Sequence, residues 1–129
     1  MAITEITKIK TTGIDHVALH VSDLERSKDF YINILGMTEH HGGTSYCFLK
    51  CGNQIVGLFD NGGPLGQTGV ELSHMALNVD TGTYEEVKAN LEAHGVAVHG
   101  RSGDPRCIYF DDPDGHGLQI MPTDHRSGR

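Results

Sequence analysis

The chain repeats one short segment, and this repeat constrains the fold more than any other feature does. Residues 15–21 read DHVALHV, and residues 73–79 read SHMALNV almost half a chain length later. Each copy alternates polar and apolar residues, as a half-buried β-strand does. Each copy also carries a histidine at its second position, His16 and His74. Self-similarity over this distance predicts two structural modules built on one plan, with the functional site where the copies meet.

The composition disfavours several classes of function. Among 129 residues, 17 are acidic and 10 are basic, which gives a formal net charge of −7. A nucleic-acid-binding protein needs a basic surface, so we expect neither nucleic acid nor a membrane as a partner. We find no run of ~18 apolar residues and no secretory signal, so a cytoplasmic location is expected. The three cysteines, Cys47, Cys51 and Cys107, form no CxxC pair and are expected to be reduced thiols.

The first module is predicted to have the order βαβββ. A strand over 14–21 is followed by apolar residues at helical spacing, which predict an amphipathic helix over 24–35. Ser22 and Glu25 have the spacing of a capping box at the start of this helix. The pair His40-His41 precedes two glycines and is expected in a loop. Further strands are expected at 46–49 and 54–59.

The second module repeats this order. Thr83 and Glu86 form a second capping box before a helix that stops at Gly95. The turn over 112–115 joins the last two strands, and His116 within it is expected to be exposed. Strands are expected at 72–79, 97–99, 107–110 and 117–121. The chain thus divides into a 1–12 N-terminal extension, a 13–60 first module, a 61–70 Gly-rich linker, a 71–122 second module and a 123–129 polar tail.

Strand alternation assigns the two faces of each predicted sheet. The apolar residues of the first strand should pack on the helix, while His16 and His20 lie on the opposite face. In the second copy, His74 and Asn78 lie on that opposite face. The same alternation in the last strand turns Gln119 toward it as well. A sheet with helices on one side and a cavity on the other is consistent with both faces.

These patterns resemble the vicinal oxygen chelate superfamily, which includes glyoxalase I, extradiol dioxygenases, fosfomycin-resistance thiol transferases, methylmalonyl-CoA epimerase and bleomycin-resistance proteins. The resemblance rests on DHVALHV, SKDFY before Leu35-Gly36, SHMAL, and YFDDPDGHGLQI, and it covers roughly residues 13–122. It implies an α+β fold, in which the sheets of two βαβββ modules form an open U-shaped barrel around a central cavity. Family members often dimerise, so a homodimer is expected.

The resemblance also implies a metal site. Metal-dependent members take their ligands from the first and last strands of each module, which places the ligands here at His16, His74 and Gln119. The family usually has Glu at the third of these positions. Two imidazoles suit a divalent metal such as Fe, Mn, Zn or Ni, but a neutral amide oxygen is a weaker donor than a carboxylate.

Five further residues are candidates for the site. Tyr109 and His20 are the catalytic candidates: Tyr109 because related enzymes place a substrate-contacting Tyr there, and His20 because it shares a face with His16. Tyr46, Arg106 and Asn78 are the candidate substrate-binding residues. Core packing for Tyr109, a position at the rim for His20 and a solvated strand-end position for Arg106 are the competing interpretations.

Three hypotheses for the function follow. The first is a metal-dependent enzyme acting on a small oxygen-chelating substrate, of the isomerase, lyase, thiol transferase or ring-cleaving dioxygenase type. The second is a non-catalytic small-molecule or antibiotic-binding protein that has lost the metal, as the missing carboxylate at Gln119 would allow. The chain has no Trp and only 6% aromatic residues, which counts against a large planar drug. The third is a degenerate relative with an empty cavity.

Overall fold

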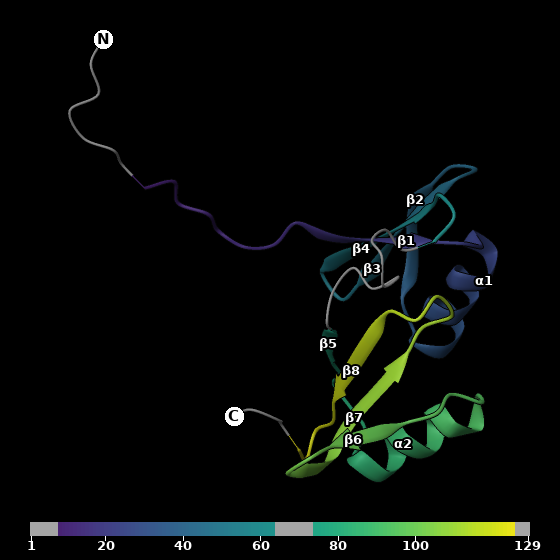
Figure 1. Ribbon diagram of the computed structural model, residues 1–129. Coiled ribbons are helices and arrows are strands. Elements are labelled where there is room, and N and C mark those ends of the chain that lie inside the picture. The colour runs from purple at the N-terminus through teal and green to yellow at the C-terminus, as the bar shows by residue number, and fades with distance from the viewer. Residues whose placement is uncertain (1–7, 64–73, 126–129) are drawn as a thin grey trace.

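The computed structural model describes residues 8–63 and 74–125, and within them both modules have the predicted order βαβββ (Figure 1). Most of the predicted linker therefore lies outside the described residues. The elements in chain order are β1 (His16–Val21), α1 (Leu24–Asp29), the π-helical turn η1 (Phe30–Ile34), β2 (Thr38–Gly42), β3 (Tyr46–Cys51), β4 (Gln54–Asp60), β5 (Met75–Asn78), α2 (Tyr84–Ala93), β6 (His99–Arg101), β7 (Asp104–Asp111) and β8 (Gly117–Met121).

Each module forms its own four-stranded mixed sheet. The strand order is β1-β4-β3-β2 in the first sheet and β5-β8-β7-β6 in the second. The pairs β1–β4 and β5–β8 are parallel, and the other pairs are antiparallel. The first sheet lies above the second in Figure 1. This arrangement confirms the predicted α+β class and is consistent with an open barrel. No helix in the described part of the chain is long and apolar enough to cross a membrane.

One continuous core joins the two modules. The buried faces of the strands are those that alternation predicts: Leu19 and Val21 on β1, and Leu118 and Ile120 on β8, are at most 6% exposed. Both helices pack against this core, α2 through Leu91. The two modules therefore share their main source of stability, because burial of apolar surface is the dominant favourable term in folding.

The start of α1 differs from the prediction in one residue. Asp23, rather than Ser22, caps the helix, because its backbone is extended and its Oδ1 accepts the Arg26 N–H at 3.1 Å. Ser22 is instead held by the second module, since its Oγ donates to Asp114 Oδ1 at 2.6 Å. Ser22 and Asp23 both carry a side-chain oxygen that can cap a helix, so the sequence pattern alone could not show which of the two residues is the N-cap.

The predicted helix over 24–35 is also not one regular helix. It changes at Phe30 to a single π-helical turn, in which the Leu35 N–H donates to the Phe30 carbonyl at 3.2 Å. The consecutive residues Phe30 and Tyr31 are both buried there, at 6% and 0% exposure. Such turns are often found at functional positions. Here the turn places the Tyr31 hydroxyl against the second module.

The loop over 112–115 clamps the two modules together. The buried Tyr31 hydroxyl donates to Asp112 Oδ2 at 2.7 Å, although the two residues are 81 positions apart in the chain. Burial is the main cause that raises the pKa of Tyr31 well above its ordinary value, and the Asp112 carboxylate adds to it. Asp114 of the same loop accepts both the backbone N–H and the hydroxyl of Ser22. The loop is therefore an inter-module contact as well as a turn.

The prediction that His116 is exposed is wrong. Its side chain is fully buried, and its backbone N–H donates to Asp112 Oδ1 at 2.9 Å. Its Nε2 lies 2.9 Å from the backbone carbonyl oxygen of His20 on β1. A contact across 96 positions of sequence is invisible to a local turn pattern, which is why the prediction failed.

Three further predictions rest on local sequence patterns, of which one is confirmed and two are wrong. The capping box of α2 is confirmed, with both hydrogen bonds between Thr83 and Glu86 present. The pair His40-His41 was expected in a loop but lies within β2, where it is exposed. The strand expected at 97–99 begins at His99 instead. Both errors lie on outermost strands, which have a single neighbour to define them.

Candidate metal and substrate site

His16 stands on the face of β1 opposite the helices. Its Nδ1 lies 2.8 Å from Asp15 Oδ1, and its side chain is 43% exposed. Histidine ligands of metals commonly bond a carboxylate through the other ring nitrogen, which fixes the ring and raises its basicity. The Asp15 contact therefore engages Nδ1 of His16 and leaves Nε2 as the ring nitrogen that points away from Asp15.

An aromatic cluster surrounds His16 on the open face of the first sheet, the face opposite the helices. Phe48 of β3 meets the His16 ring edge-on at 5.8 Å, and its own ring stacks on His41 at 4.9 Å. Tyr46 stacks on Phe59 of β4 at 6.3 Å. The sequence analysis identified Tyr46 as a candidate but missed Phe48, His41 and Phe59. The alternation of β3 would have identified Phe48, because it lies on the same face of the strand as Tyr46.

The open face of the second sheet carries a matching group. His74 directly precedes β5 and meets the Tyr109 ring edge-on at 5.5 Å, while Tyr109 stacks on His99 at 5.7 Å. Gln119 of β8 is the register partner of both Tyr109 and Ala76, so it lies in the same group. Its side chain is buried at 2% exposure. The structure thus brings together His74, Tyr109 and Gln119 on one sheet.

His16 lies across a hollow from β5. One hollow of about 190 Å³ is lined on one side by residues 14–17 and on the other by residues 75–77, which directly follow His74. His74 itself lines a different hollow of about 370 Å³, together with His99 and Tyr109. The two imidazoles therefore belong to different sheets and different hollows.

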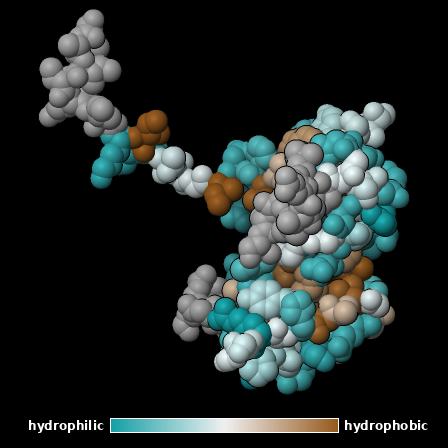
Figure 2. Space-filling model, viewed as in Figure 1, coloured by the Kyte–Doolittle hydropathy of each residue, from teal (hydrophilic) through white to brown (hydrophobic). Residues whose placement is uncertain are grey.

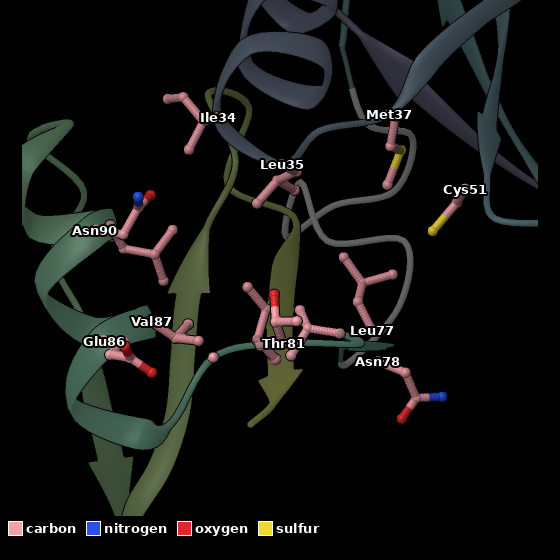
Figure 3. Close-up of a pocket in the computed structure, with 14 residues that line it drawn as sticks. Ile34, Leu35, Met37, Cys51, Leu77, Asn78, Thr81, Glu86, Val87 and Asn90 are labelled. Carbon is pink, nitrogen blue, oxygen red and sulfur yellow. The ribbon is translucent and has the colours of Figure 1, made fainter. Parts of the chain in front are cut away.

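The other candidate residues lie apart from these groups. Arg106 is on the helix-facing side of β7, where its guanidinium group contacts Asp124 Oδ2 at 3.1 Å and lies 5.0 Å above the Tyr84 ring. His20 is half-buried, and its backbone carbonyl oxygen lies 2.9 Å from Nε2 of His116. Asn78 is exposed at the end of β5, and Figure 3 shows its amide turned away from the other labelled residues.

A largely apolar groove runs between the modules on the helix side of the second sheet. Its volume is about 360 Å³, and Figure 2 shows hydrophobic surface between the upper and lower parts of the molecule. In Figure 3, Ile34 at the end of η1 and Leu35 directly after it line the groove on one side, and α2 contributes Val87 and Asn90. No sequence candidate except Asn78 lines this groove, so it is separate from the groups around His16 and His74.

The thiols of the first module are poor nucleophiles. Burial is the main cause that raises the pKa of Cys47 to about 11, and burial also raises the pKa of Cys51. Both are therefore protonated near neutral pH, and a protonated thiol reacts slowly. All three cysteines are free, as predicted. A reaction at the candidate site that uses a thiol would need one from a second substrate.

Comparison with known proteins identifies the family. The family model of the glyoxalase/bleomycin resistance protein/dioxygenase superfamily matches residues 13–120. The chain belongs to this superfamily. Glyoxalase-superfamily relatives include glutathione transferase FosA of Serratia marcescens, which is 31% identical over 84% of this chain and 79% of its own. Metallothiol transferase FosB of Staphylococcus saprophyticus is also 31% identical, over 84% of this chain and 75% of its own.

Solved structures of the superfamily agree with the fold. An integron cassette protein from the mobile metagenome of the Halifax Harbour sewage outfall matches with a TM-score of 0.69. It is 29% identical, and the match covers 85% of this chain and 97% of that one. The family resemblance drawn from the sequence is thereby confirmed.

The predicted ligands carry donor atoms of types that divalent metal ions bind. His16 and His74 offer imidazole nitrogens, and Gln119 offers an amide oxygen. The set carries no negative charge, so it should hold the metal less tightly than a set with a carboxylate. Asp15 supplies a carboxylate next to His16, one of the predicted ligands.

Proposed function

We propose that this protein is a divalent-metal-dependent thiol transferase, which adds a small thiol to a small substrate that chelates the metal through oxygen. The proposal is carried by the placement of His16, His74 and Gln119 on the open faces of the two sheets. Two 31% identical relatives are named as a glutathione transferase and a metallothiol transferase, which supports this reaction type over the isomerase, lyase and dioxygenase alternatives.

Each proposed residue has a defined task. His16, oriented by Asp15, would hold the metal with His74 and Gln119; the bound ion would act as a Lewis acid toward the substrate oxygens. Tyr109 lies between His74 and His99, where its hydroxyl could donate to a developing oxyanion. Tyr46 and its aromatic neighbours offer an apolar wall for the substrate.

The roles of the remaining candidate residues stay predictions, and the structure supports some of them more than others. His20 as a catalytic group keeps the support of strand alternation, which places it on the same face as His16. Asn78 as a substrate contact has weaker support, because it lines the groove on the helix side of the second sheet. Arg106 has weaker support, because Asp124 and Glu85 already pair with it. A cytoplasmic location also stays a prediction.

We further propose that the protein works as a homodimer. In the described residues, β1 and β5 are outermost strands of separate sheets, and each lies at or beside a proposed ligand. Unpaired strand edges favour pairing with another chain. Light scattering should report twice the chain mass of 14.0 kDa; a monomer at micromolar concentration would contradict this part of the proposal.

The function is tested by metal content and thiol transfer together. Protein loaded separately with Mn, Fe, Zn and Ni is incubated with glutathione and a panel of small oxygen-rich electrophiles, and adducts are measured by mass spectrometry. We expect one metal-dependent adduct, which His16→Ala abolishes and Lys50→Ala, on the exposed part of β3, leaves unchanged. Adduct formation that persists in His16→Ala would refute the role of the metal site.

A second candidate function is binding without catalysis. The observation in its favour is the aromatic cluster of Tyr46, Phe48 and Phe59, which gathers much of a small aromatic content on one open face. Binding of a planar ligand with unchanged affinity in His16→Ala, and without any turnover, would favour this function.

A further inference from the structure

A second group of metal-binding side chains lies outside the candidate site. Asp104 and Cys107 stand near the start of β7, and His125 follows β8 in the C-terminal segment. One donor atom from each lies within 4.8 Å of the others. The Cys107 residue is 2% exposed, and the side chains of Asp104 and His125 are 21% and 26% exposed. The group is therefore buried at the sulfur and open to solvent at the other two donors.

We propose that Asp104, Cys107 and His125 form a second metal site, which takes a borderline divalent cation such as Zn²⁺ and fastens the C-terminal segment to β7. The three donors are a thiolate, an imidazole and a carboxylate, which are the three ligand types that zinc prefers in proteins. A solvent molecule can complete the tetrahedron through the exposed side.

A tetrahedral ion requires the three donors, which now lie within 4.8 Å of one another, to adjust around it. Zinc–ligand distances of roughly 2.0–2.3 Å imply donor–donor distances of roughly 3.3–3.6 Å. His125 Nε2 now lies 2.8 Å from Asp104 Oδ1 and 3.0 Å from Oδ2 because the two are hydrogen bonded. Replacing the shared proton with a metal ion requires this pair to open by roughly half an ångström, which two partly exposed side chains allow.

Charge and proton balance also favour a cation. The Asp104 carboxylate faces the other two donors, since both of its oxygens lie within 3.0 Å of His125 Nε2. On binding, the Cys107 thiol releases its proton to solvent, and the proton between His125 and Asp104 moves to Nδ1 of the same imidazole. The sulfur and Nε2 then each offer a lone pair to the metal. The thiolate and carboxylate then neutralise the two positive charges of the ion.

The segment that carries His125 is held in place by its neighbours. Asp124 accepts the Tyr84 N–H at 2.8 Å and contacts Arg106, while the Thr123 N–H and hydroxyl both donate to the Gly82 carbonyl. Little further ordering is needed to bind an ion, because the ligand positions are already set by contacts that do not involve it.

Cobalt(II) substitution tests the site, because a cysteine thiolate gives bound cobalt a near-ultraviolet charge-transfer band. The predicted ligands His16, His74 and Gln119 include no thiol, and Cys51, which lines the same hollow as His16, is tested separately by Cys51→Ser. We expect one equivalent of Co²⁺ to generate it in the wild-type protein and in His16→Ala, and zinc to displace the cobalt. Loss of the band in His16→Ala, or its absence from the wild type, would overturn the proposal.

Variants of the ligands localise the band. Cys107→Ser should remove it, and His125→Ala should weaken Co²⁺ binding by more than about 100-fold, since even loss of an outer-shell partner costs about 10–100-fold. His125 is partly exposed, so this variant tests the site even if Cys107→Ser fails to fold. Cys51→Ser is the matched control and should keep the band; a band that survives in Cys107→Ser or His125→Ala refutes the site.

Discussion

Gln119 shows how far a single residue can alter the chemistry of a site. Its position on β8, in register with Tyr109 and Ala76, is where the superfamily pattern has a glutamate. The amide has nearly the same shape as the carboxylate but lacks its charge. The difference therefore acts on the affinity and electrophilicity of a bound metal, and leaves the packing of the strand unchanged.

Restoring the charge should tighten metal binding. A carboxylate next to a divalent ion adds attraction of about 1–4 kcal/mol for unit charges in a partly solvated site. We expect Gln119→Glu to bind Mn²⁺ at least about tenfold more tightly in calorimetry, while Gln119→Met, of similar size but without an oxygen donor, binds more weakly. Equal affinities in the three proteins would show that Gln119 does not face the metal.

The Tyr31 hydroxyl should contribute to stability in a pH-dependent way. Its pKa is raised above the ordinary value of 10.0 in the folded protein, mainly by burial, so the unfolded chain loses this proton first as the pH rises. The stabilisation is complete below pH 10 and declines above it. Tyr31→Phe should lower the free energy of unfolding by about 1–3 kcal/mol at neutral pH, because the buried Asp112 carboxylate then lacks one hydrogen bond.

Urea unfolding at several pH values measures this effect. The free energy of unfolding should fall less steeply above pH 10 in Tyr31→Phe than in the wild type. Tyr84→Phe, which removes a hydroxyl from a half-buried ring under Arg106, is the matched control for the loss at neutral pH. Parallel pH profiles for Tyr31→Phe and the wild type would contradict the assignment.

At the level of elements, β4 determines how the first open face is built. Gly57 is the register partner of both Ala18 and Phe48, and a Cβ atom there would lie 3.1 Å from both the Phe48 and Phe59 rings. The glycine therefore leaves room for the aromatic cluster to lie flat against the sheet. The position of His16 depends on it indirectly, through the edge of Phe48.

A methyl group at this position should disturb the site more than the fold. We expect Gly57→Ala to displace both rings, to cost about 1–3 kcal/mol in stability, and to lower the proposed activity through a weaker hold on the metal. Circular dichroism and metal titration measure the two effects, with Lys50→Ala as a control on the neighbouring strand. Unchanged metal affinity would mean that the rings do not support His16.

The elements also show what the sequence can and cannot predict. Alternation along β1 and β8 predicted correctly which residues face the core, because burial on one face imposes a period of two. The cap at Asp23, the buried His116 and the strand that contains His41 were mispredicted. The buried side chain of His116 is decided by a distant segment, and the cap at Asp23 by a neighbouring residue with nearly the same local chemistry. The strand that contains His41 is an outermost strand with a single neighbour, β3. The joint placement of the proposed ligands stays a prediction.

At the level of the whole molecule, the shared core and the 112–115 loop make the two modules one cooperative unit. Asp114 binds Ser22, and the Ser27 hydroxyl lies 3.4 Å from its other oxygen. Arg26 adds an ion-pair contact at 3.5 Å. The modules are similar in plan, and their buried apolar residues form one cluster.

Calorimetry should therefore show one unfolding transition. Asp114→Ala removes the contacts to Ser22 and leaves polar groups of α1 unsatisfied, so we expect a loss of about 1–3 kcal/mol. A domain of this size should then unfold at a temperature lower by several degrees, at about 3–6 °C per kcal/mol. Two resolved transitions in the wild-type protein would show that the modules unfold independently.

The bond between Tyr31 and Asp112 has a consequence for the order of events during synthesis. All strands of the first sheet have left the ribosome once Asp60 has emerged, so that sheet can form early. The acceptor of the Tyr31 hydroxyl arrives only with the last hairpin, 81 positions after the tyrosine itself. Until then, the nascent first module must keep this side of its helix hydrated. We therefore expect the final packing of α1 to be a late event, completed when the C-terminal hairpin has been translated.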